Sequence, residues 1–417
     1  MAPVNLLIVG AGSRGTGYAS YAAAHPDEVQ IVGVAEPREI YRQRLIDEYS
    51  IAPENVFADW RAAAAVEKFA DAVVVATQDA MHVEPAEAFA AKGYHMLLEK
   101  PMAPDEEGCR RIHQAVKTAG VMLAVCHVVR YTTVTQKIKQ LLDQGAIGDI
   151  VSVQRLEPVG YWHQAHSFVR GNWRNEAESS AMLLAKSCHD VDWLRFILGV
   201  PCKKVSSFGN LKHFRAEQKP AGAAARCLDC DLASECAYAA QKIYLGRVRD
   251  GQTGWPVDVL TPDVDEEAVL QALREGPYGR CVYDCDNDVV DHQVVNFLFE
   301  SGATAAFTMT AFARGRGRET RIFGTKGELF SDDEKIEVFD FLTDARRDIE
   351  IDPTDPSILG GHGGGDYGLM QCFVAAVAEG DPTRILSGPD ETLESHFMVF
   401  AAERARKNGT VEMVPSV

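Results

Sequence analysis

The opening of the chain constrains its fold more than any other stretch. An apolar run of strand length, Val4–Val9, leads directly into a Gly-x-Gly-x-x-Gly motif formed by Gly10, Gly12 and Gly15, and a segment compatible with a helix follows. In such a motif the first glycine permits a tight turn, the second lets the backbone approach a pyrophosphate, and the third lets the helix pack closely on the strand. The phosphates of a dinucleotide would lie on the free N–H groups at the start of that helix.

A second apolar run supports the same interpretation. Val29–Ala35 ends in Glu36, which follows Gly15 by 21 residues. An acid at this place accepts hydrogen bonds from the ribose hydroxyls and repels a 2′-phosphate. We therefore predict a dinucleotide site that prefers NAD, while Arg38 and Arg42 lie close enough to keep NADP open as the alternative.

Two domains are expected, because 417 residues are too many for one core. Up to about residue 125, short apolar runs alternate with helical patterns such as Glu39–Tyr49, Glu84–Ala91 and Glu106–Thr118. This alternation is typical of βαβ units and of a parallel, doubly wound sheet. The runs expected to form its strands are Leu6–Val9, Ile31–Ala35, Ala72–Ala76, His95–Leu98 and Met122–Val125.

The charge balance excludes two classes of partner. The chain carries 42 basic and 60 acidic residues, a formal net charge of −18, which argues against nucleic acid and against anionic membrane surfaces. No apolar segment approaches the roughly 20 residues that a membrane span requires, and no basic region precedes the first apolar run. We therefore expect a cytoplasmic protein whose ten cysteines do not form a disulfide framework.

Ligands of a doubly wound sheet bind beyond the carboxyl ends of its strands. Three stretches occupy such places: Thr77–His82, Glu99-Lys100-Pro101 and Cys126–Tyr131. Pro101 favours an extended or turn conformation for Lys100, and a lysine at this edge would project toward the nicotinamide end of the dinucleotide. Its charge can hold a substrate hydroxyl and lower the pKa of that group. The alternative is an ordinary surface lysine before a proline.

These elements together resemble one known family. The glycine motif, Glu36, Thr77 with His82, and the Glu99-Lys100-Pro101 triplet are similar to those of the glucose–fructose oxidoreductase / inositol dehydrogenase (Gfo/Idh/MocA) family. The resemblance covers nearly the whole chain and weakens between about residues 205 and 290. It implies a Rossmann domain, expected over residues 1–127, and an α+β domain over 128–417 with a large, mostly antiparallel open sheet and a Cys-rich insertion.

The resemblance also implies an activity and a set of contacts. Similar proteins mostly oxidise or reduce secondary alcohols of sugars and cyclitols with NAD(P), usually as homodimers or homotetramers. The residues then expected to contact the dinucleotide are Gly10, Gly12, Ser13, Arg14, Gly15, Glu36, Thr77, His82, Glu99 and Lys100.

A run rich in aromatic and basic residues, Tyr161–Arg174, is the first candidate for the substrate site. Sugar sites combine rings for C–H faces with charged or imidazole donors for hydroxyls. The alternative is a polar surface loop anchored by its aromatic residues. This run and the stretch after the last parallel strand, together with Asp192 of the segment described next, give the expected substrate contacts: Arg130, Tyr131, His163, His166, Arg170, Trp173 and Asp192.

The segment Met182–Leu194 is the second candidate. It resembles the family's Gly-Gly-Gly-x-Leu-x-Asp-x-Gly-x-His-x-x-Asp pattern, which makes His189 the expected acid/base group and matches Asp192 to the last acid. The pattern's first Asp is replaced by Ala185, and Lys186 adds a second ammonium group. Imidazole exchanges protons near neutral pH, whereas two neighbouring lysines lower each other's pKa, so Lys186 is an alternative base. A helix-capping role for His189 is the third possibility.

Cysteines in the insertion have the spacing of metal ligands. Cys227, Cys230 and Cys236 form a C-x2-C-x5-C pattern, and Cys281 and Cys285 follow some 45 residues later. With Cys281 as the fourth ligand, the set could close a tetrahedral structural Zn²⁺ site and staple a segment with little apolar pattern of its own. Free cysteines without metal are the alternative, and an iron–sulfur cluster fits the count less naturally.

A glycine cluster, residues 360–365, precedes a helical pattern and is a candidate lid, substrate loop or hinge, with His362 and Asp366 as further site candidates.

Three functions remain in consideration. The first is an NAD-dependent dehydrogenase for a sugar, glycoside or cyclitol, in which Lys100 and His189 handle the hydroxyl proton. The second is a redox-neutral glycosidase that oxidises its substrate transiently with a tightly held NAD. The third is a non-catalytic nucleotide-binding regulator.

Overall fold

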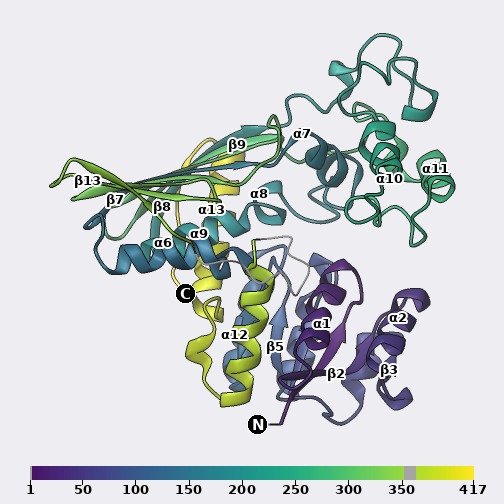
Figure 1. The fold of residues 1–417 in the computed structure, drawn as a ribbon, viewed down its shortest axis with the longest axis horizontal. Coiled ribbons are helices and arrows are strands. Elements are labelled where there is room, and N and C mark those ends of the chain that lie inside the picture. Colours follow the sequence, from purple (N-terminus) through teal and green to yellow (C-terminus); the bar gives the residue numbers. More distant parts are fainter. Residues whose placement is uncertain (1, 352–362) are drawn as a thin grey trace.

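Six parallel strands form the first of two sheets in the computed structural model, which describes residues 2–351 and 363–417 (Figure 1). They lie in the order β3-β2-β1-β4-β5-β6, so the chain reverses direction across the sheet between β1 and β4. The strands are β1 (Val4–Val9), β2 (Val29–Ala35), β3 (Val56–Phe57), β4 (Ala72–Val75), β5 (His95–Leu98) and β6 (Leu123–Val125). This confirms the predicted parallel, doubly wound sheet, whose ligand crevice lies where the strand order reverses.

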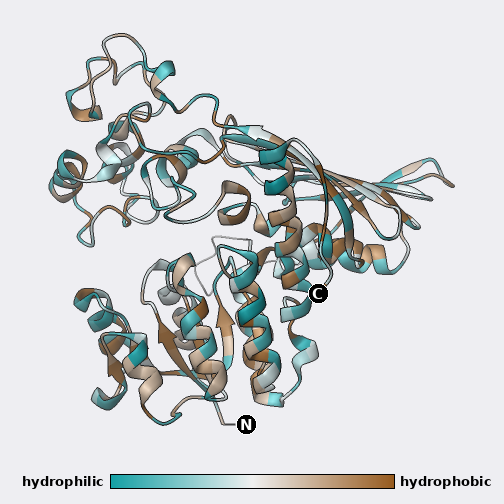
Figure 2. Ribbon diagram, turned by 180° about the vertical axis from the view of Figure 1, so that it is seen from behind, coloured by the Kyte–Doolittle hydropathy of each residue, from teal (hydrophilic) through white to brown (hydrophobic). Residues whose placement is uncertain are grey.

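Helices cover both faces of this sheet, which explains the apolar character of its strands. All four residues of β4 are buried, and hydrophobic strands stand between helices with polar outer faces in Figure 2. The covering helices are α1 (Ser13–Ala24), α2 (Glu39–Tyr49), α3 (Trp60–Ala65), α4 (Val83–Ala91) and α5 (Glu106–Ala119).

The second sheet has nine strands in the order β14-β13-β12-β11-β7-β10-β9-β8-β15. Among the described residues, only β7 and β10 of this sheet pair in parallel, so the sheet is the predicted large, mostly antiparallel one. Its strands are β7 (Ile150–Pro158), β8 (Cys202–Asn210), β9 (His292–Phe299), β10 (Thr304–Thr310), β11 (Glu319–Gly324), β12 (Gly327–Ser331), β13 (Ile336–Asp340), β14 (Ala345–Ile349) and β15 (Val411–Met413).

Helices join the two sheets. The second part of the chain contributes α6 (Thr133–Asp143), α7 (Tyr161–His163), α8 (Met182–Ala185), α9 (Cys188–Leu198), α12 (Gly365–Glu379) and α13 (Pro389–Asn408). Helix α12 lies beside α1 and β5 (Figure 1), and α13 packs on α5 as well as on β8. Leu393 and Phe397 of α13 belong to the apolar core of the first sheet. Among the described residues, no helix is long and apolar enough to cross a membrane.

Residues 211–291, between β8 and β9, form the insertion and contain α10 (Gly246–Arg249) and α11 (Glu266–Glu275). The insertion was expected to have little apolar pattern, but it has a buried core of its own. Its members include Phe214, Tyr244, Val257, Val269 and Leu273, which pack with Ala165 and Val169 of the turn after α7. This segment can therefore fold by burial of apolar side chains.

The predicted zinc site is not supported. Cys227, Cys230, Cys236 and Cys281 do line one cavity of about 40 Å³, so their spacing correctly indicated that they lie together. All four are free thiols, and the described part of the chain contains no group of three or more Cys, His, Asp or Glu side chains arranged to hold a metal ion. The cavity also contains apolar side chains such as Leu232 and Val282, and the surrounding core supplies the stability that the metal was invoked to provide.

Candidate active site

The glycine turn after β1 has the geometry of a pyrophosphate cradle. Gly10 has a positive φ of 92°, and a Cβ on Gly15 would lie 1.9 Å from the carbonyl oxygen of Gly10, so neither position accepts a side chain. A Cβ on Gly12 would meet nothing nearer than the Arg38 guanidinium at 3.6 Å. No side chain caps α1, and no acid lies in its first turn, which leaves its first N–H groups to an anion. The exposed Ser13 begins this turn. These residues fit a dinucleotide.

Glu36 is buried at the end of β2 and holds the glycine turn. Its Oε2 accepts a hydrogen bond from the Ala11 N–H at 2.8 Å, and its Oε1 accepts from the backbone N–H and the guanidinium of Arg38 at 2.9 and 2.7 Å. Burial alone would raise the pKa of this carboxyl, but the hydrogen bonds from Arg38 and Ala11 outweigh it and lower the pKa. A ribose would therefore share a carboxylate that Arg38 already engages.

Arg14 ties the glycine turn to two other parts of the chain. Its Nε donates to Glu99 Oε1 at 2.6 Å, and its Nη2 donates to the Tyr18 hydroxyl and to Asp366 at the start of α12. Tyr18 also donates to Glu99, at 2.7 Å. Asp366 is thus placed at this site, whereas His362 lies outside the described residues. The ion pair between Arg14 and Glu99 therefore holds the start of α1 to the end of β5.

The loop that carries Lys100 is held from both sides. His82, which is fully buried, directs Nδ1 to the Pro101 carbonyl at 2.8 Å and Nε2 to the Thr77 carbonyl at 3.2 Å. The Met102 N–H donates to His396 Nε2 of α13 at 3.0 Å. The expected contact of His82 with the dinucleotide does not agree with this placement, because both ring nitrogens face backbone carbonyls. Thr77 itself remains partly accessible at the crevice.

Lys100 reaches across to the second part of the chain. Its Nζ donates to the carbonyl oxygen of Ala185, the last residue of α8, at 2.7 Å. Lys186 follows, with its Nζ 3.4 Å from Glu157 Oε1 at the end of β7. His189 lies in the first turn of α9, nearly buried. The three predicted catalytic side chains thus belong to two segments that meet at Lys100.

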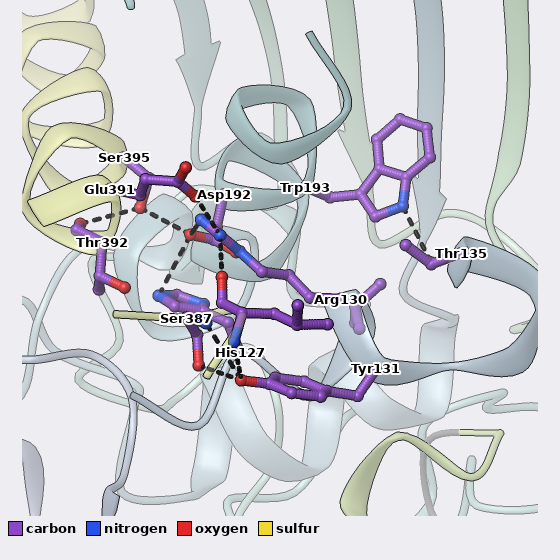
Figure 3. Close-up of polar contacts among 12 residues, drawn as sticks. His127, Arg130, Tyr131, Thr135, Asp192, Trp193, Ser387, Glu391, Thr392 and Ser395 are labelled. Atoms are coloured by element: carbon purple, nitrogen blue, oxygen red, sulfur yellow. Dashed lines mark hydrogen bonds and ion pairs between the residues drawn. The ribbon is translucent and has the colours of Figure 1, made fainter. Parts of the chain in front are cut away.

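Arg130, Tyr131 and Asp192 bond to other side chains and backbone groups of the chain (Figure 3). The Arg130 guanidinium is fully buried and forms two hydrogen bonds to Asp192, at 2.6 and 2.7 Å, and one to Glu391 at 2.6 Å. Burial would raise the pKa of Asp192, but Arg130 outweighs it and lowers the pKa. The Tyr131 hydroxyl accepts from the Leu386 N–H at 3.0 Å. These polar groups instead join the end of β6 and α9 to α13 and to the segment before it, so substrate contact by them stays a prediction.

The aromatic run does not form the predicted substrate site at two of its four candidates. His166 is buried, with Nδ1 2.9 Å from the Tyr244 hydroxyl and its ring stacked on Tyr278. The buried Arg170 donates to the carbonyl oxygens of Arg280 and Tyr238 at 2.8 and 2.9 Å. Both side chains anchor the insertion. The other two candidates are partly exposed: Trp173 packs on Phe168, and His163 lies against Trp255.

Two histidines were missed. His127 lies two residues after the end of β6, is fully buried and lies edge-on to His189 with 5.8 Å between ring centroids. Its place after a parallel strand was a usable signal. His396 lies in the middle of α13, where the helical pattern is ordinary, and nothing in the sequence pointed to its bond with the Lys100 loop.

Comparison with known families gives a clear match. A sequence model of an oxidoreductase family with an NAD-binding Rossmann fold matches residues 4–127, and the model of that family's C-terminal alpha/beta domain matches residues 139–413. Together they span nearly the whole chain.

Individual relatives are more distant. The Bacillus subtilis protein YteT is 24% identical over 318 residues, which cover 72% of this chain and 71% of YteT. The 2,7-anhydro-N-acetylneuraminate hydratase of Escherichia coli is 31% identical over 147 residues, 35% of this chain and 38% of the hydratase. The inositol 2-dehydrogenase of Streptomyces avermitilis is 28% identical over 199 residues, 47% of this chain and 53% of that enzyme. The alignments with the hydratase and the dehydrogenase thus span less than two thirds of either protein.

Solved structures share the fold along the whole chain. Levoglucosan dehydrogenase, solved with NADH and L-sorbose, superimposes with a TM-score of 0.71 at 20% identity, and all of both chains is covered. An oxidoreductase from Agrobacterium radiobacter, solved with NAD⁺, L-tartaric acid and magnesium, gives a TM-score of 0.71 at 14% identity over 99% of both chains. At these identities the likeness is one of fold.

Proposed function

The chain belongs to the Gfo/Idh/MocA oxidoreductase family, whose members act on CH–OH groups, and from this premise we propose that it oxidises or reduces a secondary alcohol of a sugar, glycoside or cyclitol with NAD. The observation that carries the proposal is the contact between Lys100 Nζ and the Ala185 carbonyl. It brings the end of β5, where a nicotinamide would lie, against the segment that holds Lys186 and His189.

The residues at this contact suit proton transfer from an alcohol. The Lys100 ammonium can hold the substrate oxygen and favour its alkoxide, and His189 can take up the hydroxyl proton. Lys186 is the weaker candidate for a base because Glu157 already pairs with it. When bound, NAD supplies the hydride acceptor, and the chain contributes orientation and proton transfer.

The preference for NAD rests on Glu36. Its carboxylate lies beside the glycine turn, where it would repel a 2′-phosphate. NADP stays the alternative because the Arg38 guanidinium bonds to the same carboxylate and is half exposed.

We also propose that the protein is a cytoplasmic homodimer or homotetramer. An outer-face patch on the second sheet, made of Phe208, Val294, Val411 and Met413, leaves large apolar side chains exposed. Phe208 and Val294 are cross-strand partners, and β15 pairs alongside on β8. A contiguous apolar patch of this kind on a sheet face is typical of a subunit interface.

A second candidate function is redox-neutral conversion of a glycoside or anhydro-sugar with a retained NAD. Two observations favour it: the family's acid is replaced by Ala185, and two relatives carry the name of an anhydro-sugar hydratase. The third possibility, a non-catalytic regulator, is supported only by the same replacement of the family's acid by Ala185.

The test is turnover of a panel of sugars, glycosides and inositols with NAD and NADP, read by NADH absorbance and by mass spectrometry of the products. We expect growth of NADH together with a ketone product, and we expect Lys100→Ala to abolish turnover while NADH still binds. Lys117→Ala, an exposed lysine on α5, is the control. A converted glycoside without NADH would establish the second candidate, and full activity of Lys100→Ala would refute the assigned mechanism.

A further inference from the structure

A group of rings, two of them exposed and two half-buried, lies where the insertion meets the end of β7. We call it the aromatic patch; it consists of the rings of Tyr161, Trp162, His163 and Trp255 and of the Arg247 guanidinium beside them. Trp255 packs against Trp162 and His163 with ring centroids 5.2 and 4.9 Å apart. Trp255 is nevertheless 45% exposed and Tyr161 is 39% exposed. The patch therefore presents aromatic surface to solvent instead of filling the core.

Arg247 adds a positive charge that lacks an acidic partner. Its guanidinium lies over the Trp162 ring at 4.2 Å, and its Nη1 donates only to the Ile243 carbonyl, at 2.6 Å. No carboxylate of the described residues forms an ion pair with it; burial lowers its pKa, and the neighbours that oppose this are the hydroxyls of Tyr161 and Tyr244. Arg249, two residues further along α10, pairs with Glu266.

The patch follows, along the chain, the strand that holds Lys186. Tyr161 begins three residues after the end of β7, and Glu157 of that strand binds Lys186. On its other side, Trp255 leads to Pro262, whose carbonyl accepts a hydrogen bond from Arg44 of α2 at 3.2 Å. Helix α7 accordingly lies between α8 and α10 (Figure 1). The chain thus connects the patch through β7 to the segment of Lys186 and, through the stretch after Trp255, to the first domain.

We propose that the aromatic patch binds the carboxylate-bearing ring of an acidic carbohydrate, a uronate, whose alcohol is presented to Lys100. This deepens the proposed function and rests on it. Indole and phenol rings cover the C–H faces of a sugar, and a guanidinium binds a carboxylate through two parallel hydrogen bonds. A neutral sugar would use the rings but leave Arg247 without a counter-charge, so the cation selects the acid.

The test measures binding apart from turnover. Quenching of tryptophan fluorescence is titrated with methyl β-D-glucuronide and with methyl β-D-glucoside, on the wild-type protein, Arg247→Gln, Arg247→Lys and Arg249→Gln. We expect the glucuronide to bind more tightly than the glucoside, and Arg247→Gln to weaken only the glucuronide, by about tenfold. Arg249→Gln should bind both like the wild type. Arg247→Lys keeps the charge but loses the two parallel hydrogen bonds, so its affinity for the glucuronide should lie between those of the wild type and Arg247→Gln.

Equal affinity of the wild type for both glycosides, or an unchanged glucuronide affinity in Arg247→Gln, would overturn the inference. Trp255→Phe should reduce affinity for both glycosides, and unaltered binding there would also contradict it. The outcome is separable from that of the proposed function, because NADH binding and turnover are measured on the same proteins. Turnover of neutral sugars without glucuronide binding would refute only the inference about the uronate. Arg247-dependent binding without any turnover would refute only the proposed dehydrogenase activity.

Discussion

Single buried residues determine how this protein responds to pH. Burial lowers the pKa of His127 and His166 to about 3 and that of His396 to about 4. These side chains are therefore neutral at pH 7, and His396 can accept the Met102 N–H only in that state because its Nδ1 already faces the Thr392 carbonyl. The loop of Lys100 thus depends on an uncharged imidazole in the last long helix.

Acid should weaken the fold through His396 in particular. A histidine in the unfolded chain has a pKa of about 6.5, so its contribution is complete above that pH and is lost as the pH falls toward the folded value of about 4. Between pH 7 and pH 5 we expect His396→Gln, which keeps an acceptor for Met102, to lose about 1–2 kcal/mol less unfolding free energy than the wild type. Urea unfolding at the two pH values measures this. Parallel losses in both proteins would show that His396 is not the titrating group.

The buried pair of Arg130 and Asp192 should be essential for stability rather than for substrate contact. Asp192→Asn leaves a fully buried guanidinium with one counter-charge fewer, and we expect a loss of about 3–5 kcal/mol in the free energy of unfolding. Glu391→Gln is the matched control, because that carboxylate bonds the same guanidinium but is 46% exposed, and it should cost about 1 kcal/mol or less. Equal losses in urea titrations would contradict this distinction.

At the scale of elements, the turn between β1 and α1 contains one glycine that we expect folding to require and another that we expect cofactor binding to require. Gly15→Ala would push a Cβ into the Gly10 carbonyl, whereas the Cβ of Gly12→Ala makes only an ordinary van der Waals contact with the Arg38 guanidinium, at 3.6 Å. We expect Gly15→Ala to lower the thermal unfolding midpoint strongly. Gly12→Ala should keep the midpoint but bind NADH at least about tenfold more weakly, because its methyl group occupies the path of the pyrophosphate. Thermal unfolding and NADH fluorescence titration check the pair, and an unchanged NADH affinity in Gly12→Ala would argue against this cradle.

Local patterns predicted the elements that depend on local interactions. The strands around Leu6, Val74 and Leu97 and the turn at Gly10–Gly15 follow from runs of neighbouring residues, and the structure contains them. The contacts of His166 and Arg170 could not be predicted because their partners lie 57 or more residues away, in the insertion. The contacts of Arg130 could not be predicted for the same reason, since Asp192 and Glu391 are remote in sequence. The sequence shows which side chains are polar, but it does not show which distant segment will bury them.

For the whole molecule, the outer-face patch predicts self-association. Phe208 and Met413 are 67% and 57% exposed on adjacent strands. We expect Phe208→Arg combined with Met413→Arg to yield a smaller species by light scattering, because two charges cannot be buried across a symmetric interface. Val66→Arg, an exposed apolar position in the first domain, should leave the mass unchanged. A wild-type protein that is already monomeric would contradict the proposed assembly.

The return of α13 to the first domain has a consequence for synthesis. Leu393 and Phe397 complete a core that otherwise consists of residues from the first 125, so the nascent Rossmann domain leaves the ribosome with part of its apolar surface uncovered. At about 5–20 residues per second, the missing helix follows on the order of tens of seconds later. During that interval the unfinished domain offers an apolar surface to chaperones or to other nascent chains. A ribosome-bound chain ending before α13 is therefore the form of this protein most exposed to aggregation.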